Sequence, residues 1–205
     1  MDYRQIFALY LPILIDQAFI VGLNLVNTAM ISSSGVAAVS AVNIVDSLNI
    51  FLISVFVAVA TGGTVVVAQY KGSRNDRNVS RASAATVTAV TLLAVVIGLL
   101  LIGFHNPLLK LLFGAASAHV LDNARVYLIG SSISYVGLAV VQAVCSALRG
   151  IGKTRASLSL SLIMNLMYVL LNLLLITLLD MGVLGMTLAI NIARFAGAAC
   201  ALYYL

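Results

Sequence analysis

Residues 82–109 read ASAATVTAVTLLAVVIGLLLIGFHNPLL, a stretch that contains no Asp, Glu, Lys or Arg. A helix that crosses the hydrocarbon core of a membrane needs about 20 apolar residues at a rise of about 1.5 Å per residue. The stretch is long enough for one such crossing. Strands of a transmembrane barrel would instead alternate polar and apolar side chains over about 10 positions, which these residues do not do. The stretch therefore predicts a transmembrane helix.

Comparable apolar stretches recur along the whole chain. Of 205 residues, 62% are hydrophobic and 8% are charged, whereas soluble domains carry roughly 25% charged residues. A soluble fold of this length has too little interior to hide so much apolar surface. We therefore expect an all-α integral membrane protein, a single six-transmembrane-helix bundle over residues 1–205. The helices are expected near residues 6–31, 44–70, 84–104, 124–147, 156–179 and 184–205.

The basic residues are distributed unevenly between the two ends of these helices. With the N-terminus inside, the cytoplasmic ends would hold Arg4, Lys71, Arg74, Arg77, Arg81, Arg149, Lys153 and Arg155. The opposite ends would hold Lys110 and Arg125. Because cytoplasmic loops are enriched in Lys and Arg, this bias predicts a cytoplasmic N-terminus. We expect a multi-pass protein of a cell membrane. The short loops fit a protein of the bacterial inner membrane. Its basic residues would contact membrane lipids, and no nucleic-acid partner is expected, because no basic patch contains interleaved aromatic residues.

Catalytic and metal-binding patterns are missing from the sequence. It contains no Ser/His/Asp set, no paired carboxylates at catalytic spacing and no glycine-rich phosphate loop. Cys145 and Cys200 both fall in predicted helices and lack the spacing of a metal or redox site. We therefore expect a protein that is not an enzyme and that holds neither a metal nor a cofactor.

Three charged residues are candidates for charges within the membrane: Asp16, Asp46 and Arg194. A charge near the centre of a bilayer costs about 2.5–3.5 kcal/mol on insertion scales, so it usually has a partner or faces a wet cavity. Asp16 and Arg194 lie at similar depths from opposite ends of their helices, which allows an intramembrane ion pair between them. Asp46 is open to two interpretations: a carboxylate that caps the second helix at the outer interface, or part of an ion site.

Polar side chains also follow single faces of two helices. Asp16 and Asn27 share one face of the first helix, and Asn165, Tyr168 and Asn172 share one face of the fifth. Hydrogen bonding between helices would explain such residues without a transport role. Alternatively, their carboxylate and amide oxygens would bind a cation or substrate. The candidate ion- and substrate-binding residues are Asp16, Asn27, Asp46, Asn165, Tyr168 and Asn172.

Several short motifs, in this order and spacing, cover nearly the whole chain. They are LPI (11–13), LVNTAM (25–30), ATGG (60–63), VAQYKG (67–72), ALRGIGKT (147–154), NLLLI (172–176) and GVLGM (182–186). Together they resemble the N-terminal six-helix lobe of the multidrug and toxin extrusion (MATE) family. The resemblance implies one lobe of a twelve-helix antiporter. Such a transporter exports organic cations or drug-like amphiphiles, including xenobiotics, and couples their multidrug efflux to sodium or proton entry.

Two positions depart from the pattern that the resemblance implies. Asn27 stands where the family commonly has the first-helix Asp that carries the coupling ion, and Asn172 stands where some members have a second acidic residue. An amide cannot titrate, which puts proton coupling at Asn27 in doubt. Coupling through this lobe would then depend on Asp46 or Asp16.

The second lobe of such a transporter does not follow in these residues. We expect an N-terminal half or fragment, completed by the missing C-terminal lobe or by a second copy. One alternative is a lipid-linked oligosaccharide flippase of the same superfamily, which would carry more basic residues in its cavity. Another is a non-transporting membrane assembly subunit, which would not need polar helix faces.

Overall fold

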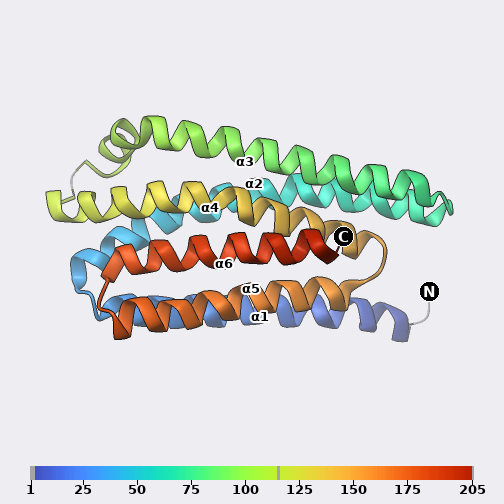
Figure 1. Cartoon of the computed structure of the whole chain (residues 1–205), viewed down its shortest axis with the longest axis horizontal. Coiled ribbons are helices and arrows are strands. Elements are labelled where there is room, and N and C mark those ends of the chain that lie inside the picture. The colour runs from blue at the N-terminus through green and yellow to red at the C-terminus, as the bar shows by residue number, and fades with distance from the viewer. Residues whose placement is uncertain (1–2, 115, 205) are drawn as a thin grey trace.

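The computed structural model describes residues 3–114 and 116–204, and this part of the chain forms six long helices and no strand (Figure 1). The elements are α1 (Tyr3–Ser32), α2 (Val36–Gly72), α3 (Asp76–Phe113), α4 (Ala118–Gly150), α5 (Thr154–Asn172), the π-helical segment η1 (Leu173–Leu178) that continues α5, and α6 (Gly182–Tyr204). Each of the six helices is long and apolar enough to cross a membrane. The expected fold class, an all-α membrane bundle, is confirmed.

Two helices begin well before the expected positions. α2 begins at Val36 and not at residue 44, and α3 begins at Asp76 and not at residue 84. For α3, the expected start left out the mostly polar residues 76–83, through which backbone hydrogen bonding continues. For α2, residues 36–43 are mostly apolar, and the helix begins directly after the turn at Gly35. A turn at Gly35, whose φ of 97° favours glycine, ends the connection from α1. Residue 205 and the side chain of Arg4 lie outside the described part.

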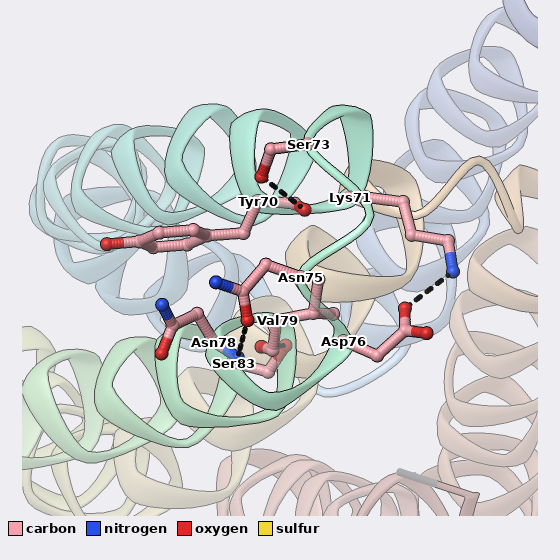
Figure 2. Close-up of polar contacts among 8 residues, drawn as sticks. All are labelled: Tyr70, Lys71, Ser73, Asn75, Asp76, Asn78, Val79 and Ser83. Carbon is pink, nitrogen blue, oxygen red and sulfur yellow. Dashed lines mark hydrogen bonds and ion pairs between the residues drawn. The ribbon is translucent and has the colours of Figure 1, made fainter.

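Side chains fix the turn between α2 and α3 (Figure 2). The side-chain oxygen of Asn75 accepts a hydrogen bond of 3.2 Å from the backbone N–H of Asn78 and caps α3. Lys71 Nζ lies 3.0 Å from Asp76 Oδ1 and forms an ion pair across the turn. Asp76 also sits in the first turn of α3, where the helix dipole favours a negative charge. The turn therefore connects α2 and α3 directly, with no longer loop between them.

α4 is the central helix of the bundle and packs against α2, α3, α5 and α6. In Figure 1, α1 and α5 run side by side on one side of α6, and α2, α3 and α4 lie on the other. The small side chains of α4 are consistent with this central position, since helices in membranes associate closely where small residues meet. The buried small residues of α4 include Gly130, Ser131, Ser132, Ser134 and Gly137.

Glycines bring α6 into close contact with α4. A Cβ added at Gly137 would lie 2.8 Å from both the carbonyl carbon and the carbonyl oxygen of Arg194. Further along the same face, the Asn191 amide donates a 2.9 Å hydrogen bond to the carbonyl oxygen of Gly130. These contacts fix the position of the α6 backbone at Arg194 and thereby the direction of its side chain.

The beginning of α1 and the end of α6 lie at the same end of the bundle, on the right in Figure 1. The turns that join α2 to α3 and α4 to α5 lie at this end as well, and carry most of the basic residues. Successive helices thus alternate in direction, and their even number brings the start of α1 and the end of α6 to the same end of the bundle.

Candidate functional site

A cavity of about 620 Å³ opens between α1, α2, α4, α5 and α6. Its volume lies within the roughly 300–1,000 Å³ typical of small-molecule sites. Four charged side chains are among the lining residues: Asp16, Asp46, Arg149 and Arg194. Since charges inside a membrane are costly unless they face a partner or water, this cavity is the candidate site.

Asp46 is held by a chain of hydrogen bonds between α2 and α4. Its Oδ1 accepts hydrogen bonds of 3.0 Å from the hydroxyl of Tyr127 and 3.0 Å from the amide of Asn49. The side-chain oxygen of Asn49 accepts in turn from the hydroxyl of Tyr135, which is fully buried. Asp46 therefore lies inside α2 and does not cap it, because the helix begins at Val36. No hydrogen bond to the second carboxylate oxygen, Oδ2, forms with a described residue.

Asp16 joins α1 to α5 further along the cavity. Its Oδ1 accepts a 2.6 Å hydrogen bond from the hydroxyl of Ser161, and the carboxylate is 7% exposed. The amide of Asn165 donates to the backbone carbonyl of Ser161 at 2.9 Å. The three residues all line the cavity. Asp16 and Asn165, both expected in the site from the sequence, thus come together through a serine that the sequence did not single out.

Asn27 and Asn172 form the second contact between α1 and α5. The amide of Asn172 donates a 2.8 Å hydrogen bond to the side-chain oxygen of Asn27, and Asn172 is fully buried. The side-chain oxygen of Asn172 itself has no partner among the described residues. The π-helical segment η1 begins at the next residue, and π-helical turns occur frequently at functional sites. The helices thus bring together Asn27 and Asn172, the two amides at positions where the resemblance implied acidic residues.

Arg194 points toward α4 and not toward Asp16. Its Nη1 donates a 2.7 Å hydrogen bond to the hydroxyl of Ser134. Within the described part of the chain, the ion pair that forms is Lys71–Asp76 at the surface, so the expected Asp16–Arg194 pair is not made. The reason lies in the packing, since α6 is pressed against α4 whereas α1 packs mainly against α5. Asp46 lines the same cavity as Arg194, but the described residues form no ion pair between the two side chains.

The sequence reasoning missed the hydroxyl and amide groups that hold these charged residues. They are Asn49, Tyr127, Ser134, Tyr135 and Ser161. One signal was available: Tyr127, Ser134 and Tyr135 recur at a spacing that places them on related faces of one helix. Tyr168, which the sequence did single out, also lines the cavity.

Comparison with known proteins identifies this arrangement. The MatE family model matches residues 12–175. The chain belongs to the MatE family. The resemblance noted in the sequence is thereby confirmed, and as a member of a transporter family the protein is not an enzyme.

Related proteins agree with the family assignment. The chain is 25% identical over 198 residues to the uncharacterized transporter YisQ of Bacillus subtilis, a match that covers 94% of this chain and 43% of YisQ. Its fold matches a multidrug resistance MATE family transporter of the MOP superfamily, solved in an outward-facing conformation, with a TM-score of 0.91 at 18% identity. A MATE solved in complex with MaL6 gives a TM-score of 0.92 at 17% identity.

The matched structures also define how much of a transporter these residues represent. Each of the two structural matches covers 98% of this chain and 44% of the solved chain. The chain thus spans about half the length of the relatives it matches, and its six-helix bundle corresponds to one MATE lobe.

Proposed function

We propose that this lobe belongs to a secondary-active exporter of organic cations or drug-like amphiphiles, xenobiotics included, driven by inward flow of sodium or protons. The observation that carries the proposal is the cavity of about 620 Å³, in which Asp46 is held through one oxygen while its other oxygen has no described partner. A carboxylate fixed in this way can receive the cationic group of a substrate, or a coupling ion, without rearranging its support.

The proposed ion- and substrate-binding residues belong to the three polar groups described above, apart from Tyr168, which lines the cavity. They are Asp16, Asn27, Asp46, Asn165, Tyr168 and Asn172. Asn27 and Asn172 offer amide oxygens to a cation but have no proton to exchange. Coupling by protons would therefore depend on Asp16 or Asp46, whereas sodium could use the amide oxygens as well.

The transporter is completed by a second lobe, either a C-terminal lobe or a second copy, because substrate would be enclosed between two lobes. We place the N-terminus in the cytoplasm, since the end of the bundle that carries the turn at Arg74 and the turn at Lys153 is the more basic one. In this orientation, the turn at Gly35 would lie at the outer surface of the membrane. Membrane lipids would surround the bundle.

The cavity offers less support to the alternative functions. A flippase for lipid-linked oligosaccharides would favour a mainly basic cavity, whereas the charged lining residues here are two acidic and two basic. A non-transporting assembly subunit would have no use for buried carboxylates such as Asp16 and Asp46.

The test is export by the whole transporter reconstituted in lipid vesicles, with a cationic xanthene dye as substrate. Either a sodium gradient or a proton gradient is imposed, and an ionophore that dissipates it serves as the control. We expect one of the two gradients to drive the dye against its own gradient, and the ionophore to stop this movement. Dye that never moves against its gradient under either condition would overturn the proposal.

A further inference from the structure

Arg194 faces the same cavity as Asp46, and export of simple cations gives it no role. A guanidinium inside a membrane is costly, and it repels a cationic substrate. Its charge is not removed by an ion pair, because no acidic side chain of the described residues contacts it. The cavity thus presents a positive group beside a negative one, with the two held on different helices, α6 and α2.

Most of the hydrogen-bonding capacity of Arg194 remains available. A guanidinium carries five N–H donors in a planar fork that suits the two oxygens of a carboxylate. One donor is bonded to Ser134, and the described residues accept from none of the others. These other donors are also not among the buried polar atoms without partners, so they face open space in the cavity.

Packing does not explain the charge of Arg194. The contact between α4 and α6 is already fixed by Gly137, which touches the backbone of residue 194, and by the hydrogen bond from Asn191 to Gly130. An uncharged side chain would satisfy the hydroxyl of Ser134 at a lower cost in the membrane. The retained guanidinium therefore points to a ligand.

We propose that the cavity selects zwitterionic amphiphiles, with the ammonium or iminium group of the substrate at Asp46 and its carboxylate at Arg194. Tyr127 and Tyr168 line the same cavity. Their rings supply an apolar surface for the body of such a molecule. The inference deepens the proposed export function and depends on it, because it names the charge pattern of the substrate.

The experiment compares two forms of one xanthene dye, a zwitterion with a free carboxylate and its methyl ester, which is a cation. Their dissociation constants are measured by fluorescence with the whole transporter in lipid nanodiscs. In the unmodified protein we expect the zwitterion to bind more tightly than the ester. Arg194→Gln should reduce this preference by about tenfold to a hundredfold, the effect of losing a hydrogen-bonded charge partner. Arg194→Lys should keep part of it, because a lysine retains the charge without the fork.

Arg77→Gln is the matched control, since Arg77 is exposed on α3 and lies outside the cavity lining. It should leave the preference unchanged. An equal loss of affinity for both dyes in Arg194→Gln would indicate a structural role and overturn the proposal. If the Arg194 variants do not fold, the unmodified protein still decides, because equal affinity for the two dyes contradicts it. Tight binding of the ester alone would refute only this inference, whereas failure of both dyes to bind would overturn the export function as well.

Discussion

Replacing Gly137 by alanine tests whether the close contact between α4 and α6 holds the site together. The added Cβ would lie 2.8 Å from the carbonyl carbon and oxygen of Arg194 and 3.1 Å from the backbone nitrogen of Phe195. These are backbone atoms, so no rotation of a side chain relieves the overlap. The two helices must move apart, and the hydrogen bond between Arg194 and Ser134 must lengthen with them.

The expected cost follows from two opposing effects. Overpacking a well-packed contact costs about 1–3 kcal/mol, and a backbone clash belongs in the upper part of this range. Alanine is a better helix former than glycine by about 1 kcal/mol, which offsets part of that cost. We expect a net loss of about 1–2 kcal/mol in the free energy of unfolding, which corresponds to a melting temperature lower by about 2–8 °C.

The buried thiol of Cys145 gives a direct assay. Cys145 is 3% exposed and becomes reactive on unfolding, whereas Cys200 is exposed in the folded protein. Thermal unfolding in a Cys200→Ser background is followed with a dye that fluoresces when it reacts with a thiol. The melting temperature of Gly137→Ala is compared with that of its parent.

Gly62→Ala is the matched control, because a Cβ at Gly62 would meet nothing within 4 Å. It should leave the melting temperature unchanged or raise it slightly. If Gly137→Ala melts at the same temperature as Gly62→Ala, the reasoning about the α4–α6 contact is refuted.

Three further substitutions test other parts of the structure. Tyr135→Phe leaves the side-chain oxygen of Asn49, a residue 4% exposed, without its donor and should cost about 1–3 kcal/mol of stability in the same thiol assay; an unchanged melting temperature would contradict the buried hydrogen-bond chain. Asp76→Ala removes an ion pair with Lys71 in which the two side chains are 78% and 51% exposed, so the change should stay below about 1 kcal/mol; a larger loss would show that the turn depends on this pair. Asn27→Asp adds a carboxylate at the contact between α1 and α5 and should make the melting temperature rise with sodium concentration, an increase that the parent shows more weakly or lacks; a sodium response identical to that of the parent would argue against a cation site there.

Much of the fold could be predicted from the sequence, because membrane-spanning helices are recognised by their apolar composition. The apolar stretch at 82–109 and the Ser and Gly residues before Val36 are local signals for a membrane helix and a turn, and the structure contains both. The residues at which the helices begin and end were harder to predict, because a helix continues into polar residues such as Asp76 as long as its backbone can hydrogen-bond.

Which helices touch could not be derived from composition. Nothing local to α4 states that it occupies the centre, although its small residues, such as Ser134 and Gly137, are consistent with that position once the bundle is known. The choice of partner for Arg194 depends on whether α6 meets α1 or α4, which is a long-range property. Depth along a helix was therefore a sufficient reason to consider Asp16 as its partner, but not to establish the contact.

Asp46 was found from the sequence because a carboxylate in an apolar helix is costly wherever it lies. Its partners Asn49 and Tyr127 were not, since an amide three residues away on the same helix and a tyrosine on another helix are ordinary residues until the fold brings them together. Isolated charges in membrane helices are thus recognisable in a sequence, whereas the neutral groups that hold them require the structure.

The most direct test of the central claim is ion-driven dye export by Asp46→Asn, with Asp76→Asn as the control for loss of one carboxylate. Both are measured in the reconstituted whole transporter, with melting temperatures taken in parallel. The account predicts that Asp46→Asn abolishes export of the cationic ester while the protein remains folded, and that Asp76→Asn exports like the parent. Export by a folded Asp46→Asn at the rate of the parent would contradict the role of this cavity in transport.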